Sequence, residues 1–161
     1  MQNNEKDFAA RGGWWVVAQF ALIVVGVIAT LVFAGPLPDG GTLTVLRVLA
    51  VLAAIAGVVL GGLGAARLNK NLTAFPRPIA SSFLVKSGAY GLVRHPIYTG
   101  VILLMAALGL WAASEVGAVA TAVLFTFFDV KAEREEQWLS ERFADYRGYR
   151  DRVKKLIPWL Y

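Results

Sequence analysis

Two long stretches almost free of charge constrain this chain more than any other feature of its sequence. The first, Trp14 to Ala34, has 21 residues without a charge, and the second, Leu43 to Ala66, carries a single arginine. About 20 apolar residues in a helix cross the hydrocarbon core of a bilayer, whereas a signal-peptide core is shorter. Because 57% of the 161 residues are hydrophobic, a soluble domain is excluded. We therefore predict an all-α integral membrane protein.

Two further apolar helices follow in the second half of the chain. An uncharged run extends from Pro96 to Ala113, and another begins at Val116, so only a very short turn near Ser114 separates them. After Phe128 neither Pro nor Gly stops the helix before Tyr146, and it is predicted to continue as a cytoplasmic helix. The predicted spans are residues 14–34, 43–66, 96–113 and 116–130, with a cytoplasmic helix at about 131–147, all in one domain of residues 1–161. Spans three and four should form a helical hairpin.

The second predicted span has two further features. Small residues recur every fourth position, which allows another helix to approach closely: Ala53, Gly57, Gly61 and Ala65. Its one charge, Arg47, lies near the outer end, where it can extend toward Asp39 or Glu115.

Basic residues set the expected orientation. Of the sixteen Lys and Arg, two precede the first span, five lie in residues 67–94, eight follow the fourth span, and Arg47 alone belongs to the other side. Because cytoplasmic segments carry the excess of Lys and Arg, both termini and the central loop are predicted to be cytoplasmic. The protein should be a multi-pass protein of the cell (inner) membrane.

Composition also excludes several kinds of site. The chain has no cysteine and one histidine, so disulfides, thiolate chemistry and His-rich metal sites are excluded, and we expect no metal. A net charge of +5 would suggest nucleic acid in a soluble protein. In a membrane protein the distribution of basic residues first indicates the topology, and no nucleic-acid partner is predicted.

An unusual motif stands at the start of the third span, where Arg94 and the only histidine, His95, directly precede Pro96. Proline is tolerated at the first position of a helix, so this arginine and histidine should lie at a helix N-terminus. Free backbone N–H groups and the helix dipole attract anions there, and a guanidinium adds a planar fork of donors. A histidine before a proline can also simply cap the helix, and that interpretation stays open.

A second cluster is acidic and lies about 40 residues later, between Asp129 and Glu136. Asp129, Glu133 and Glu136 share one helical face by their spacing, while Glu135 points elsewhere. His95 is nineteen residues before Ser114 and Glu133 is nineteen after it, so a hairpin places them at similar heights. A cationic helix start facing carboxylates suits a zwitterion such as an amino acid. The alternative is an exposed, solvated helix face.

Together these residues resemble the isoprenylcysteine carboxyl methyltransferase and phospholipid methyltransferase superfamily. The similarity covers the chain from about Arg67 onward. It rests on Gly88-Ala89-Tyr90, Val93-Arg94-His95-Pro96-Ile97-Tyr98-Thr99-Gly100, Glu135-Glu136 with Leu139, Phe143, Tyr146 and Tyr149, Ile157-Pro158, and the segments Asn71-Leu72-Thr73 and Pro76-Arg77-Pro78.

The resemblance implies a membrane enzyme that holds S-adenosylmethionine between the Arg-His-Pro start and the Glu-Glu helix. His95, Tyr98 and Gly100 would contact the cofactor, Glu136 would receive its ammonium group, and Arg94 is our inference for its carboxylate. The expected cofactor-binding residues are Tyr90, Arg94, His95, Pro96, Tyr98, Gly100, Glu135 and Glu136. The aromatic residues Tyr90, Phe143, Tyr146 and Tyr149 are interpreted mainly as packing residues that fold the tail over the site.

The acceptor decides which further residues are needed. A carboxylate acceptor, as in isoprenylcysteine O-methylation, benefits from a cation such as Arg77 or Arg94. An amine acceptor, as in phospholipid N-methylation, must lose a proton, which Asp129 or Glu133 could take. Arg94, Asp129 and Glu133 are therefore the catalytic candidates, and the expected partners are a lipophilic or prenylated acceptor and membrane lipid. Two other classes stay open: an NADPH-dependent sterol-type reductase, which shares a similar Arg-His-Pro-x-Tyr motif, and a non-catalytic membrane subunit.

Overall fold

The computed structural model describes residues 8–68, 73, 75 and 83–161, and within these residues the regular structure is helical. The segments Asn71-Leu72 and Pro76-Arg77-Pro78, named above, lie outside the described residues. The helices are α2 (Gly13–Val32), α3 (Gly40–Leu68), the short 3-10 helix η2 (Gly88–Gly91), α4 (Pro96–Trp111), α5 (Glu115–Arg142) and α6 (Tyr146–Arg152). The all-α prediction is confirmed.

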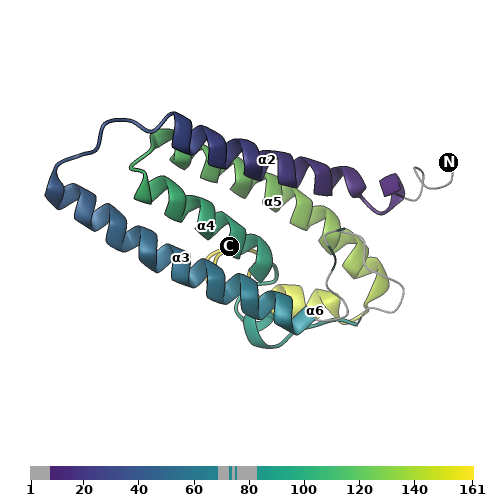
Figure 1. The fold of residues 1–161 in the computed structure, drawn as a ribbon. Coiled ribbons are helices and arrows are strands. Elements are labelled where there is room, and N and C mark those ends of the chain that lie inside the picture. The colour runs from purple at the N-terminus through teal and green to yellow at the C-terminus, as the bar shows by residue number, and fades with distance from the viewer. Residues whose placement is uncertain (1–7, 69–72, 74, 76–82) are drawn as a thin grey trace.

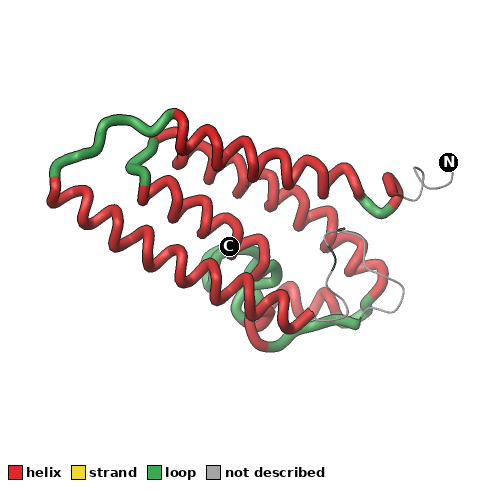
Figure 2. The backbone as a smooth tube through the Cα atoms, in the orientation of Figure 1, coloured by secondary structure: helices red, strands yellow, loops and turns green. Residues whose placement is uncertain are grey.

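Four long helices run alongside one another in the order α3, α4, α5, α2 (Figure 1). The α2–α3 and α4–α5 connections lie at one end of this bundle, and α6 lies at the other end (Figure 2). Helices α2 and α3 are long and apolar enough to cross a membrane, while α4 is apolar but shorter, with 16 residues. Large apolar side chains of α2 and α3, among them Phe20, Ile28, Leu52 and Val58, point outward and are exposed. An outward apolar surface is what a bilayer requires.

The hairpin between α4 and α5 is built from small residues. A Cβ atom at Gly117 would lie 2.5 Å from the Cα atom of Gly109, so the two helices touch backbone to backbone. Ala113 takes a positive φ of 47°, which turns the chain, and the Ser114 hydroxyl then accepts a hydrogen bond from Gly117 N at 3.2 Å. This N-cap fixes the start of α5. The predicted turn at Ser114 is confirmed.

Close packing also joins α3 to α4. A Cβ atom at Gly100 would lie 2.7 Å from the carbonyl oxygen of Gly57 and 2.9 Å from Cα of Gly61. Gly57 and Gly61, two of the small residues that recur every fourth position on α3, therefore contact α4, as expected for helices that pack through glycine. Arg47 lies over the ring of Trp111, 5.2 Å from its centroid, while Asp39 accepts hydrogen bonds from Thr42.

The end of the long helix differs from the prediction. Helix α5 stops at Arg142 because Phe143 takes an extended conformation, and the separate short helix α6 begins at Tyr146. This break turns the chain so that Tyr146 and Tyr149, both buried, pack back toward the bundle. No Pro or Gly lies at the break, so the sequence did not predict it.

Candidate active site

The C-terminal tail holds the Arg94-His95 segment in place. The backbone N–H groups of Arg94 and His95 donate to the carbonyl oxygens of Lys154 (2.8 Å) and Lys155 (3.1 Å). Pro96 is the first residue of α4, as predicted. His95 occupies the N-cap position, but its side chain makes no capping hydrogen bond. The interpretation of His95 as a simple helix cap is therefore wrong.

The two sequence motifs meet at Glu136, which is 1% exposed. Its carboxylate accepts from Arg94 Nε at 2.7 Å and Arg94 Nη2 at 3.1 Å, and it lies 3.0 Å from His95 Nε2. Burial alone would raise the pKa of Glu136, but the hydrogen bonds and charges of His95 and Arg94 outweigh it and lower that pKa to about 2. Arg94 also donates to the backbone oxygens of Arg150 and Val153. The basic helix start and the acidic helix thus neutralise one another directly.

Glu135 lines a cavity that Glu136 does not reach. Its side chain accepts a hydrogen bond from the Tyr98 hydroxyl at 2.8 Å and lies 3.7 Å from His95 Nδ1, with 26% of its surface exposed. The ring of Tyr98 stacks on His95 on one side and on Phe128 on the other, with centroids 5.3 Å and 4.7 Å away. The helical spacing had assigned Glu135 to a different face, and in the structure that face is the one that lines the cavity.

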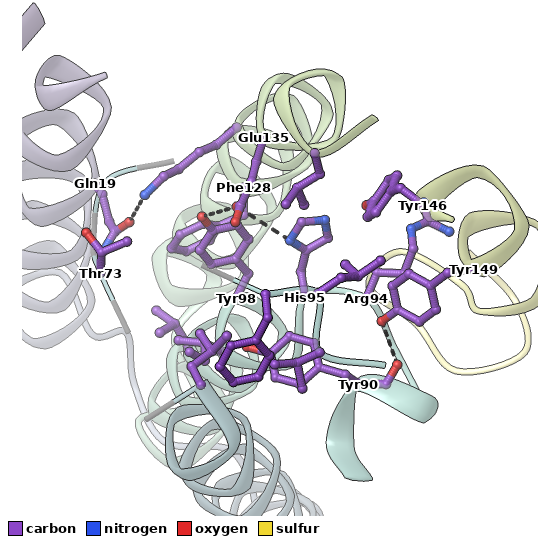
Figure 3. A pocket seen from close by; sticks show the side chains of 18 residues that line it. Gln19, Thr73, Tyr90, Arg94, His95, Tyr98, Phe128, Glu135, Tyr146 and Tyr149 are labelled. Carbon is purple, nitrogen blue, oxygen red and sulfur yellow. Dashed lines mark hydrogen bonds and ion pairs between the residues drawn. The ribbon is translucent and has the colours of Figure 1, made fainter. Parts of the chain in front are cut away.

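The cavity has a volume of about 360 Å³, within the range of roughly 300–1,000 Å³ typical of small-molecule sites. Figure 3 shows Gln19 and Thr73 at one end and Tyr146 and Tyr149 at the other, with Tyr98 and His95 between them. The lining residues come from distant parts of the chain: Gln19, Leu68, Thr73, Phe83, Leu84, Val85, Tyr90, Arg94, His95, Ile97, Tyr98, Val101, Phe128, Lys131, Glu135, Leu139, Tyr146 and Tyr149.

Three tyrosines form one end of this cavity. The Tyr149 hydroxyl donates to the backbone oxygen of Tyr90 at 2.6 Å. The Tyr146 hydroxyl is buried and has no hydrogen-bond partner within the described part of the chain. Burial raises the pKa of all three phenols, Tyr90, Tyr146 and Tyr149, so each stays neutral. A buried hydroxyl without a partner is rare and leaves a donor for a bound molecule.

Several candidates from the sequence lie outside the cavity. Asp129 and Glu133 accept hydrogen bonds from Lys155 at 2.7 Å and 3.1 Å, and the Tyr161 hydroxyl adds a third at Asp129. Burial lowers the pKa of Lys155, but the bonds from these carboxylates outweigh it and the pKa is raised. Gly100 packs against α3, and neither it, Pro96 nor Glu136 lines the cavity.

Two of the polar lining residues, Lys131 and Gln19, were not among the candidates. Lys131 of α5, only 1% exposed, donates to the Gln19 side chain of α2 and lies 5.1 Å from the ring centroid of Tyr98. Burial lowers the pKa of Lys131 to about 8, against an opposing effect of the Glu135 charge. Both residues had a signal in the sequence: a glutamine inside an uncharged span and a lysine directly after one.

The sequence is similar to those of known proteins. A 71-residue stretch is 37% identical to Methanethiol S-methyltransferase 1 of Bradyrhizobium diazoefficiens (strain JCM 10833 / BCRC 13528 / IAM 13628 / NBRC 14792 / USDA 110), covering 44% of this chain. The chain spans only 24% of that relative's length. The sequence profile described as phospholipid methyltransferase matches residues 45–146, which is more than half of the chain and contains the Arg94-His95 segment with Glu135 and Glu136. The chain therefore belongs to the phospholipid methyltransferase family.

Proposed function

We propose that this protein is an S-adenosylmethionine-dependent methyltransferase that acts on a lipophilic acceptor at the membrane. The observation that carries the proposal is the cavity beside the Arg94-His95 segment, which Glu135 and Tyr146 both line. S-adenosylmethionine supplies a methyl group on a sulfonium, and the acceptor takes it by in-line displacement. The protein then contributes mainly positioning and exclusion of water.

The lining residues fit such a donor. The methionine part of the donor carries an ammonium group, and Glu135 offers a carboxylate whose position is fixed by Tyr98. Glu136 is paired with Arg94 and His95, so we assign the ammonium group to Glu135 and give Glu136 the role of positioning Arg94 and His95. The Tyr146 hydroxyl offers a further hydrogen bond, and the rings of Tyr90 and Tyr149 provide aromatic surface for the adenine.

We also propose that α2, α3, α4 and the apolar half of α5 each cross the membrane, with both termini in the cytoplasm. The outward apolar side chains of α2 and α3 and the position of both short connections at one end of the bundle support this topology. The eight basic residues after the fourth predicted span would then lie on the cytoplasmic side. A lipophilic acceptor can reach the cavity from the bilayer.

Two acceptor classes have support. A carboxylate of the isoprenylcysteine type is the acceptor implied by the sequence motifs. A thiol is favoured by the relative whose name specifies methanethiol. N-methylation of a phospholipid amine has less support, because the two expected bases, Asp129 and Glu133, bind Lys155 outside the cavity.

Ligand-dependent thermal stability of the detergent-purified protein tests this proposal. S-adenosylhomocysteine at about 100 times its dissociation constant should stabilise the fold by about 2.7 kcal/mol, because it binds the folded state only. NADPH should have no effect. Glu135→Gln should weaken binding of S-adenosylhomocysteine at least tenfold, while Glu133→Gln, on the same helix but outside the cavity, should not.

If NADPH stabilises the protein and S-adenosylhomocysteine does not, the proposed methyltransferase activity is wrong and a reductase is favoured. Full affinity in Glu135→Gln would remove the assignment of the ammonium site. Binding of S-adenosylhomocysteine without transfer of radiolabelled methyl to any carboxylate, thiol or lipid in a membrane extract would favour the non-catalytic subunit.

A further inference from the structure

Residues 157–161 form a loop, the tail loop, whose shape is fixed by its own hydrogen bonds. The backbone N–H groups of Leu156 and Ile157 both donate to the backbone oxygen of Tyr161 at 2.8 Å. The backbone N–H of Tyr161 donates in return to the oxygen of Ile157 at 3.0 Å. Trp159 takes a positive φ of 61°, a conformation that bulky residues rarely adopt. The bonds close the loop and hold Trp159 in this unfavourable conformation.

The tail loop is fixed against α4 and the apolar half of α5. The Thr99 hydroxyl of α4 donates to the backbone oxygen of Leu156 at 2.8 Å, and the Tyr161 hydroxyl donates to Asp129 of α5 at 3.0 Å. The Tyr161 ring also contacts the ring of Phe125, with centroids 6.1 Å apart. In Figure 1 the C end accordingly lies back along the bundle, near α4. The tail loop therefore lies at the level where the apolar run of α5 ends at Asp129.

Two large apolar side chains of the tail loop point away from the protein. Trp159 is 86% exposed and Leu160 is 74% exposed, the two highest values among the large apolar side chains of the described residues. The neighbouring Leu156 is only 1% exposed, so the tail buries an apolar side chain where the bundle offers a place for it. Exposed apolar surface is unfavourable in water and favourable in a bilayer. Tryptophan in particular prefers the membrane–water interface, because its ring is apolar and its N–H can still bond to water or a headgroup.

Size and charge favour a lipid surface over a protein partner for this loop. A stable protein interface contains about 20–30 residues a side, whereas the outward apolar surface here comes from two neighbouring residues. Insertion of two side chains into a bilayer needs no further matching surface. Residues 151–154 add two exposed basic side chains, Arg152 and Lys154, against one exposed acidic side chain, Asp151. Basic residues beside an inserted segment attract anionic headgroups.

We propose that the tail loop inserts Trp159 and Leu160 into the cytoplasmic membrane–water interface. The inference rests on the membrane topology proposed above, in which the apolar run of α5 meets the cytoplasm at its inner end. It goes beyond that topology, because the chain then contacts the bilayer through a segment that does not cross it. The same tail binds the backbone N–H groups of Arg94 and His95. Insertion of the tail loop therefore holds the start of α4, and with it the donor site, at the membrane surface.

Fluorescence quenching in lipid nanodiscs tests the insertion. Because the chain has no cysteine, Trp159→Cys and Leu160→Cys each provide one thiol for a small environment-sensitive fluorophore. Both side chains are exposed, so their replacement should leave the fold intact. Each labelled protein is reconstituted at one copy per disc in phosphatidylcholine with phosphatidylglycerol. At both positions, quenching by a lipid with a nitroxide near its headgroup should exceed quenching by aqueous iodide at least about twofold.

Two labelled controls in the same discs separate this inference from the topology on which it rests. Ala144→Cys, exposed between α5 and α6, should be quenched mainly by iodide. Leu52→Cys, exposed on α3, should be quenched mainly by a lipid with a nitroxide near the end of its acyl chain. If Leu52→Cys is instead quenched by iodide and by neither lipid, α3 does not cross the membrane and the proposed topology is wrong.

With both controls as expected, the labels in the tail loop decide the inference. Preferential quenching by the headgroup nitroxide at positions 159 and 160 supports insertion. If iodide quenches these positions as strongly as position 144, the tail loop lies in water and the inference is wrong. If neither quencher reaches them, protein and not lipid covers the tail loop, and the inference is wrong as well. The measurement needs no methyl donor, so its result does not depend on the proposed activity.

Discussion

Two neighbouring tyrosines at the cavity differ in whether the hydroxyl group has a hydrogen-bond partner in the described part of the chain. Tyr146 and Tyr149 are both buried, and their rings contact edge to face with centroids 5.8 Å apart. The Tyr149 hydroxyl satisfies a backbone oxygen of Tyr90, while the Tyr146 hydroxyl has no partner in the described part of the chain. A buried polar group that the fold leaves unpaired costs stability. We therefore expect the Tyr146 hydroxyl to serve ligand binding and the Tyr149 hydroxyl to stabilise the fold.

Removal of each hydroxyl should therefore give opposite results. Tyr146→Phe should leave the melting temperature of the ligand-free protein unchanged or slightly higher, and should weaken S-adenosylhomocysteine binding about two- to tenfold, the worth of one hydrogen bond. Tyr149→Phe should lower the melting temperature and change affinity less. Differential scanning fluorimetry and calorimetric titration measure the two quantities. If Tyr146→Phe destabilises the free protein and leaves the affinity unchanged, its hydroxyl serves the fold.

At the same scale, sequence reasoning predicted that the two motifs meet, but not which partner each side chain contacts. The pairing of the Arg94-His95 segment with the acidic helix followed from counting residues on either side of Ser114. The division between Glu135 and Glu136 did not, because neighbouring helix positions point about 100° apart and only the tail and α4 decide which partner each one meets. Lys131 was counted only as a topological charge, since nothing in the sequence reveals that it faces Gln19.

The packing between α3 and α4 shows that sequence reasoning is limited in the same way at the scale of whole helices: it predicts a close contact but not the partner. The small residues that recur every fourth position on α3 predicted a close helix contact, and the family resemblance implied that Gly100 contacts the cofactor. In the structure the two predictions describe one contact, since Gly100 lies against Gly57 and Gly61. A glycine pattern shows that a backbone is approached closely, but it does not show by what. In the same way, no Pro or Gly in the sequence predicts the end of α5 at Arg142.

Alanine substitutions of two glycines test the packing between α3 and α4. Gly100→Ala should lower the stability of the protein in detergent by roughly 1–3 kcal/mol, because its methyl group would overlap the backbone of α3. Gly62→Ala, where an added Cβ meets nothing within 4 Å, should be neutral or stabilising by up to about 1 kcal/mol from helix propensity. Thermal unfolding of both variants without ligand makes the comparison. Equal stability of the two would mean that α3 and α4 lie further apart than the structure shows.

For the whole molecule, the arrangement of the helices links the site to the membrane. The cavity lies toward the end of the bundle that carries α6 and the basic tail, while the Ser114 turn and the α2–α3 connection lie at the opposite end. If all four long helices cross, the donor site faces the cytoplasm and the apolar wall of Ile97, Val101 and Phe128 lies nearer the bilayer. A soluble donor and a lipophilic acceptor would then reach one cavity from different phases.

Because the chain has no cysteine, single cysteine substitutions report this topology without background. Leu37→Cys and Glu115→Cys, both at exposed positions, should react with a membrane-impermeant maleimide in intact cells. Ala144→Cys, also exposed and between α5 and α6, should react only after permeabilisation. Position 115 decides the number of crossings, because if only α2 and α3 crossed, it would lie on the same side as position 144. Labelling of Glu115→Cys only in permeabilised cells would therefore reduce the four crossings to two, and labelling of Ala144→Cys in intact cells would reverse the orientation derived from the basic residues.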